Sequence, residues 1–178
     1  DTDLFTVNKA YHSLHQEKQD LPSLRLANLT YFKQELTIDT YIDEVVAHAK
    51  VVILKLLGGR AYFGYLCEAL EEYCTENDVQ LIFLPGDTKP DLDLMSASTA
   101  PLQLVDQLWK YLLAGGIGNA KEALNLLMDF ADGKSDEYNQ IAVTPDLFLY
   151  HPSVGIIEKG EQFTSDSCVY IFTYRSYY

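Results

Sequence analysis

Two short turns carry the residues best suited to bind a ligand, Gly58-Gly59-Arg60 and Gly86-Asp87. Each turn directly follows a run of apolar residues. Glycine lets the backbone turn sharply and lets a ligand approach it closely. A guanidinium matches the two oxygens of a carboxylate or phosphate, so Arg60 could receive such a group, with Asp87 holding Arg60 when no ligand is bound. The alternative is that the glycines only form tight turns and Arg60 only pairs with Asp87.

Three aspartates, Asp87, Asp91 and Asp93, lie close together after the second apolar run. Carboxylate oxygens are the ligands that Mg²⁺ prefers. The same residues are also common in turns, and Asp91 is placed to cap a short helix. We favour this second interpretation and assign no metal ligand, but Asp91 stays with the two turns as a candidate for binding a ligand or partner.

No other pattern predicts catalytic residues. The sequence contains no nucleophile elbow, no P-loop and no dinucleotide-binding fingerprint. The cysteines Cys67, Cys74 and Cys168 lack the spacing of a zinc site or of a redox pair, and we interpret them as reduced packing residues. Glu71 and the neighbouring glutamates of the same helical stretch are interpreted as a solvated face.

The two turns must be positioned by the apolar runs that precede them, Val51–Leu57 and Val79–Leu84. Short β-branched runs bounded by glycine and proline are typical of buried strands, and a helix is predicted between them over Ala61–Asn77. A strand, a helix and a strand form a βαβ unit with parallel strands. The sequence therefore predicts an α/β fold, a mainly parallel sheet with helices on both faces built from flavodoxin-like or Rossmann-like units. Both turns then lie at the carboxyl ends of the strands, where such sheets bind ligands.

The remaining elements follow from periodicity and capping residues. Asp3 is placed to cap a first helix, and Thr37 to cap a second. A helical hairpin covers about residues 101–133, opened by Pro101 and divided at Gly115. Short strands are predicted at Leu24–Asn28, Val154–Ile157 and Cys168–Tyr174.

Charge and hydropathy exclude several classes of function. The formal net charge of −13 argues against a nucleic-acid-binding surface and against docking on anionic lipid. No apolar run approaches the length of a membrane span, and no signal peptide is visible. We expect a cytoplasmic protein. Because the chain starts at Asp1 and stops within a predicted strand and turn, we expect residues 1–178 to be a single α/β domain or fragment of a longer polypeptide.

Five segments occur in an order that resembles a known family: LRLAN, VVILKLLGGRAYFGY, LPGDTKPD, WKYLLAGGIGN and TYRSYY, which begin at Leu24, Val51, Leu84, Trp109 and Thr173. Together they are similar to the N-terminal part of the large, CobN-type subunit of cobaltochelatase, a relative of the H subunit of magnesium chelatase. Tyr177 departs from the family pattern, in which a histidine is expected. The resemblance covers nearly all of this chain but only a small first part of the family's much longer chains.

The resemblance implies a function at the level of a complex. Such subunits bind a tetrapyrrole and, with an AAA-type ATPase subunit that uses ATP and a further subunit, insert a divalent metal into the ring. For the CobN type the metal is cobalt and the ring is a corrin-pathway intermediate, hydrogenobyrinic acid a,c-diamide. We expect this region to be a scaffold or partner-binding part that holds no cofactor and no catalytic residue. The alternatives are a magnesium-chelatase H subunit acting on protoporphyrin IX, a stand-alone small-ligand-binding flavodoxin-like domain, and, last, a phosphoryl carrier using Asp87 and Asp91.

Overall fold

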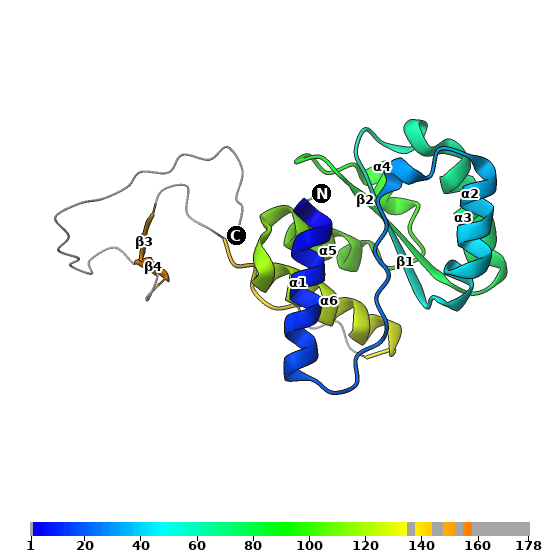
Figure 1. Ribbon diagram of the computed structural model, residues 1–178. Helices are drawn as coiled ribbons and strands as arrows, with labels where there is room; N and C mark the ends of the chain where they lie inside the picture. Colours follow the sequence, from blue (N-terminus) through cyan, green and yellow to red (C-terminus); the bar gives the residue numbers. More distant parts are fainter. Residues whose placement is uncertain (1, 135–137, 144–147, 152–154, 158–178) are drawn as a thin grey trace.

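The computed structural model describes residues 2–134, 138–143, 148–151 and 155–157 of the 178-residue chain. A small parallel sheet lies between two helical layers (Figure 1). Helices α2 (Glu35–Glu44) and α3 (Gly64–Glu76) cover one face of the sheet. The other face is covered by α5 (Leu102–Ala114) and α6 (Gly116–Ala131), with α1 (Thr2–Glu17) packed outside α6. The predicted α/β class, with helices on both faces, is confirmed.

The sheet contains the two predicted strands as parallel neighbours. Strand β1 is Val51–Leu56 and strand β2 is Gln80–Pro85, and the register pairs Val51 with Gln80 and Leu56 with Pro85. The connection between them consists of the 3₁₀ helix η3 (Arg60–Phe63) and α3. The βαβ unit inferred from periodicity is therefore present, and both strands end at the same edge of the sheet.

Side chains alternate between the two faces along each strand, as the pleat requires. Leu54 and Phe83 point toward α2 and α3, and both are buried. Ile82 and Leu84 point toward α5 and α6 and belong to the same hydrophobic cluster as Leu108. Because both faces are covered by apolar side chains, the strands are nearly continuous hydrophobic runs rather than runs that alternate with polar residues.

The helices differ in detail from the sequence expectation. Helix α2 begins at Glu35 with Gln34 as its N-cap, so the prediction that Thr37 caps this helix was wrong. Asp91 does cap the short helix α4 (Leu92–Ser96), because its Oδ1 accepts a hydrogen bond from the Leu94 N–H at 3.0 Å. The predicted hairpin is formed by α5 and α6, and Gly115 between them has the positive φ of 73° that a non-glycine residue rarely adopts.

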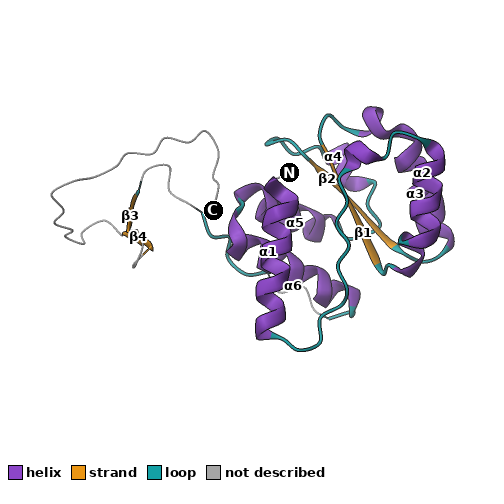
Figure 2. Cartoon of the chain, in the orientation of Figure 1, coloured by secondary structure: helices purple, strands orange, loops and turns teal. Residues whose placement is uncertain are grey.

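The connection from α1 to α2 contains no strand (Figure 2). The prediction of a strand at Leu24–Asn28 was wrong, since Asn28 instead caps the 3₁₀ helix η1 (Leu29–Tyr31). A further 3₁₀ helix, η2 (Val46–His48), leads from α2 into β1. The segment before η1 is held at its beginning by the Tyr11 hydroxyl, which donates a hydrogen bond to the Pro22 carbonyl at 2.9 Å.

A buried asparagine ties residues 138–143 to the helical hairpin. Asn119 is 4% exposed, and its Nδ2 donates to the carbonyls of Gly115 and Ala142, each at 2.7 Å. Its Oδ1 accepts a hydrogen bond from the Ala142 N–H at 2.9 Å. The side chain thus satisfies backbone groups of two segments at once, which explains why a polar residue is buried there.

Two further strands, β3 (Leu149–His151) and β4 (Gly155–Ile157), form an antiparallel pair. Strand β4 falls within the predicted strand Val154–Ile157, whereas the predicted strand Cys168–Tyr174 lies outside the described residues. In the part of the chain that the structure describes, every helix is too short or too polar to cross a membrane.

Candidate functional site

The two glycine turns meet at the carboxyl edge of the sheet, as predicted. The Gly86 N–H donates a hydrogen bond of 2.7 Å to the carbonyl of Leu56, so the second turn rests directly on the end of β1. A Cβ atom at Gly86 would lie 2.8 Å from the backbone nitrogen of Leu57 and 2.9 Å from its Cα. Only glycine fits there without movement of the backbone, so Gly86 is required for the close approach of the two turns.

The first turn depends on its two glycines in a different way. Gly58 and Gly59 have φ angles of 81° and 79°, in the left-handed region that favours glycine. A Cβ atom at Gly58 would also lie 2.8 Å from the ring of Tyr62, whereas no atom lies within 4 Å of a Cβ at Gly59. Backbone conformation is thus the constraint at Gly59, and both conformation and space are constraints at Gly58. Together they reverse the chain so that Arg60 can begin η3.

Arg60 is held by a residue that the sequence analysis placed on the solvated face. Its Nη1 and Nη2 donate to Oε1 and Oε2 of Glu71 at 2.6 and 2.5 Å, a two-pronged ion pair. The guanidinium carbon also lies 5.3 Å from the centre of the Phe83 ring, within the range of a cation–π interaction. The hydrogen bonds to Glu71 raise the pKa of Arg60 above its usual value. The expected pairing of Arg60 with Asp87 was wrong, because Glu71 already occupies both terminal nitrogens.

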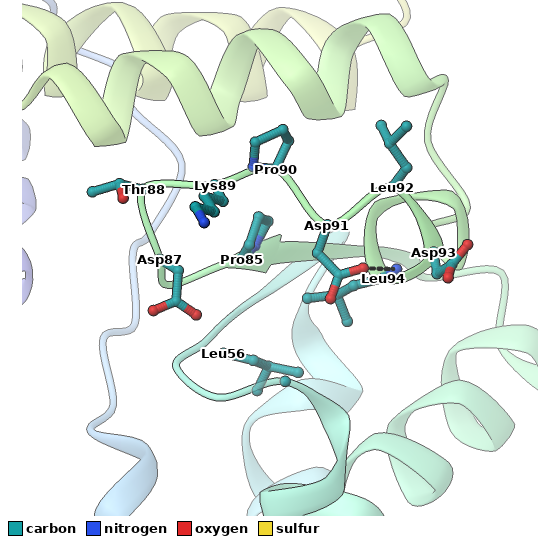
Figure 3. Close-up of a pocket in the computed structure, with 11 residues that line it drawn as sticks. Leu56, Pro85, Asp87, Thr88, Lys89, Pro90, Asp91, Leu92, Asp93 and Leu94 are labelled. Carbon is teal, nitrogen blue, oxygen red and sulfur yellow. Dashed lines mark hydrogen bonds between the residues drawn. The ribbon is translucent and has the colours of Figure 1, made fainter.

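The second turn, in contrast, lines an open pocket of about 680 Å³ (Figure 3). We call it the rim pocket; the side chains around it come from the ends of both strands, the turn after β2 and helix α4. Asp87, Thr88 and Lys89 are exposed there, and the walls include Leu56 and Pro85. The pocket therefore combines an apolar floor with charged side chains of both signs.

The three aspartates of this region do not converge on a common point. Figure 3 shows the carboxylates of Asp87, Asp91 and Asp93 pointing in different directions, with that of Asp91 engaged at the start of α4. Within the described residues no three His, Cys, Asp or Glu side chains are placed to hold a metal ion. The interpretation as turn and capping residues is the one that fits the structure, and Mg²⁺ binding by this cluster is not supported.

Lys89 is the basic residue among those that line the rim pocket. Within the described parts of the chain it forms no ion pair, so its ammonium can interact with an anionic group. The sequence analysis assigned the anion-receiving role to Arg60 and did not consider Lys89. The signal was present, since Lys89 belongs to the same loop as Asp87 after β2.

The predicted site residues thus fall into two groups. Gly59, Asp87 and Asp91 line the rim pocket. Gly58 and Gly86 shape the backbone behind it, and Arg60 is paired with Glu71.

The two described cysteines, Cys67 and Cys74, have no role in the pocket. Both are buried and free on the inner face of α3. Burial raises the pKa of both thiols, that of Cys74 to about 11, while the nearby charge of Arg60 opposes the shift at Cys67. Thiols with raised pKa values are poor nucleophiles at neutral pH, in agreement with a packing role.

Comparison with known proteins gives relatives of one kind. The chain is 35% identical over 133 residues to the aerobic cobaltochelatase subunit CobN of Pseudomonas aeruginosa, a match that covers 75% of this chain and 11% of the relative. It is 35% identical over 131 residues to the aerobic cobaltochelatase subunit CobN of a Sinorhizobium species, covering 74% of this chain and 10% of the relative. No family model matches the chain.

A solved structure has the same fold. The catalytic subunit of cobaltochelatase from Mycobacterium tuberculosis aligns with a TM-score of 0.62 and 21% sequence identity, over 85% of this chain and 11% of that one. At this identity the likeness supports the fold alone. The chain spans about a tenth of the length of the curated relatives it matches.

Proposed function

Because the chain belongs with the CobN-type subunits of cobaltochelatase over the region matched, we propose that it is part of the large subunit of an ATP-dependent cobaltochelatase. The proposed reaction is the insertion of cobalt into hydrogenobyrinic acid a,c-diamide during cobalamin biosynthesis, in the cytoplasm. The observation that carries the proposal is the identity of 35% over three quarters of the chain to CobN subunits of two bacteria.

Within that subunit we assign this region a binding role rather than a catalytic one. Metal insertion requires removal of ring protons and distortion of the macrocycle, which calls for acid–base groups and binding strain. At the carboxyl edge, Arg60 and Glu71 form a two-pronged ion pair with each other, so neither terminal nitrogen of Arg60 is left for a ring carboxylate. The titratable groups of the described residues that line the rim pocket are carboxylates and one lysine without a common focus.

The rim pocket is the surface that fits this binding role. Its volume of about 680 Å³ is within the usual range of roughly 300–1,000 Å³ for small-molecule sites. The ring substrate carries several carboxylates, and Lys89 could pair with one of them while Leu56 and Pro85 contact apolar parts. The same surface could instead receive a neighbouring part of the large subunit, with Lys89 paired to an acidic side chain.

Residues 1–178 contain no P-loop of the G-x-x-x-x-G-K-[ST] type, so energy from ATP must reach this region from outside it. We propose that an AAA-type ATPase subunit supplies it and that a further subunit completes the complex. Cobalt is then the substrate of the complex rather than a resident cofactor of this region.

Reconstitution of the full-length subunit with its ATPase and third subunit tests the proposal. Each of two rings, hydrogenobyrinic acid a,c-diamide and protoporphyrin IX, is incubated with Co²⁺ or Mg²⁺, with and without ATP, and followed by absorbance. We expect ATP-dependent cobalt insertion into the corrin-pathway ring. Magnesium insertion into protoporphyrin IX would instead favour assignment of the chain to the H subunits of magnesium chelatase. Inactivity with every pair, together with saturable ring binding by residues 1–178 alone, would favour a stand-alone ligand-binding domain.

A further inference from the structure

The two outer edges of the sheet differ in whether their backbone groups are hydrogen-bonded. On the outer edge of β2, the Leu81 and Phe83 N–H groups donate to the hydroxyls of Thr99 and Ser98, each at 2.9 Å. The Thr99 N–H in turn donates to the Leu81 carbonyl at 2.8 Å. The segment after α4 therefore closes this edge by hydrogen bonding, as edge strands require.

The outer edge of β1 has no such cover. In a strand the N–H and C=O of one residue point to the same side, and the side alternates along the chain. The carbonyls of Lys50 and Leu56 accept hydrogen bonds from β2, so the residues at odd positions, Val51, Ile53 and Lys55, turn their backbone groups to the opposite edge. Within the described residues, no hydrogen bond is made by these backbone groups. All three residues are only partly exposed, so the unpaired groups are costly.

A groove of about 650 Å³ runs along this open edge. One wall is β1 itself, and the other is the segment before η1, drawn in blue beside the strands in Figure 1. Its lining is largely apolar and includes Leu24, Leu66, Leu124 and Met128. Residues 22–27, on the far wall, form no backbone hydrogen bond to β1, although the sequence of Leu24–Asn28 is typical of a strand. Two strand-forming segments thus face each other across an apolar groove.

We propose that one further β-strand inserts into this groove, parallel to β1, and hydrogen-bonds to Val51, Ile53 and Lys55 on one side and to residues 24–28 on the other. The sheet would then contain four strands, in the order residues 24–28, inserted strand, β1, β2. A row of alternating donors and acceptors selects an extended backbone, and the apolar walls select β-branched or aliphatic side chains on it. A small ligand would not satisfy such a row along the whole edge.

The position of α1 identifies where that strand comes from. Lys55, at the carboxyl end of β1, forms an ion pair of 2.8 Å with Asp3 in the first turn of α1. A strand parallel to β1 ends at this same edge and can continue into α1 without a long connection, which is the commonest way to join such elements. The occupant is therefore a segment of the same polypeptide that directly precedes α1 in the full-length subunit. The relatives are about ten times longer than the matched region, so such a segment is available in chains of this kind.

Hydrogen exchange resolved at single residues tests the proposal. In residues 1–178 alone, we expect the amides of Val51 and Ile53 to exchange at least about 100-fold faster than those of Val52 and Leu54, which point to β2. In the full-length subunit all four should be protected alike. Equal protection of the four amides in the short chain would show that the edge is already closed. Fast exchange of Val51 and Ile53 in the full-length subunit would show that no strand inserts.

A photo-crosslinking residue at Leu24 of the full-length subunit identifies the occupant. We expect crosslinks to residues directly before α1. Crosslinks to residues 158–178, to another subunit or to a second copy of the chain would overturn the assignment even if the edge is protected. The same residue placed at Lys9, which does not line the groove, is the matched control and should not crosslink to that segment.

Discussion

The two turns at the carboxyl edge both begin with glycine and carry charged side chains, but these side chains have different environments. The first, Gly58-Gly59-Arg60, is closed, because Arg60 is bound by Glu71 and lies over Phe83. The second, from Gly86 to Pro90, stays open around the rim pocket, and its charged side chains are exposed. An arginine after a strand is thus not by itself evidence of a ligand site. Such an arginine is available to a ligand only if no other side chain of the fold already pairs with its guanidinium.

The largest expected effects concern the strands that support both turns. Leu54→Ala and Ile82→Ala should each lower the free energy of unfolding by roughly 2–5 kcal/mol, because each leaves a cavity in a packed core. Leu54 faces α3 and Ile82 faces α5, and they are 3% and 0% exposed. Denaturant unfolding monitored by circular dichroism measures both. A midpoint unchanged by either substitution would show that the strand that carries it is not buried.

Gly86→Ala tests whether the close approach of the two turns requires glycine at this position. Its Cβ would press on the backbone of Leu57, so we expect a loss of about 1–3 kcal/mol in unfolding free energy, as for other overpacked sites. Gly64→Ala is the matched control, because Gly64 begins α3 with open space around its Cβ position. That variant should be stabilised by about 0.5 kcal/mol through helix propensity. A neutral Gly86→Ala would mean that the two turns do not need their close approach.

The buried cysteines of α3 make the stability of the fold depend on pH. The pKa of Cys74 is raised by burial to about 11, from a usual value near 9. Below pH 9 the thiol is protonated in both the folded and the unfolded state, so stability is unaffected. Between pH 9 and 11 only the unfolded state releases the proton, and stability falls, by about 1 kcal/mol at pH 10.

Unfolding at pH 8 and pH 10 should therefore show a smaller loss in Cys74→Ala than in the unsubstituted chain. An equal loss in both proteins would contradict burial of this thiol. The pKa of Cys67 is raised by burial as well, but the charge of Arg60 opposes the shift. Arg60→Gln should therefore increase the pH dependence that Cys67 contributes.

The smallest expected effect tests the closed turn directly. Glu71→Gln removes the charge that holds Arg60, and we expect a loss of about 0.5–1 kcal/mol because both side chains are partly exposed. Asp87→Asn, on the open turn, should change stability by less than about 0.5 kcal/mol. Thermal unfolding of the two variants under the same conditions compares the contributions of the two turns to stability. A larger effect at Asp87 than at Glu71 would reverse our assignment of which turn is closed.

Most of the fold could be predicted because local patterns and tertiary packing agree. The runs around Leu54 and Ile82 are buried on both faces, so they are apolar throughout and stand out in the sequence. The Asp91 cap and the stop at Gly115 follow from the chemistry of single residues. The prediction of a strand at Leu24–Asn28 was wrong for a physical reason. A strand forms only where a neighbouring strand supplies hydrogen-bond partners.

The candidate site was less predictable because it depends on contacts between distant residues. Glu71 lies eleven positions after Arg60, and nothing local shows that α3 brings them together. Its helical spacing offered a partial signal: Glu71 is four residues after Cys67 and three before Cys74, both buried, so it borders the packed face. The start of α2 was missed because capping preferences favour a threonine such as Thr37, whereas the actual N-cap, Gln34, makes no side-chain capping hydrogen bond.

Our central claim is that this region binds, and does not catalyse, within a cobaltochelatase subunit. The most direct test is the rate of ATP-dependent cobalt insertion by the full-length subunit carrying Lys89→Ala, with Lys9→Ala as a control at an exposed lysine outside the rim pocket. We predict that Lys89→Ala raises the concentration of ring or partner subunit needed for half-maximal rate, leaves kcat unchanged at saturation, and differs in this from the control. A fall in kcat that saturation does not restore, or kinetics identical to the control, would contradict the claim.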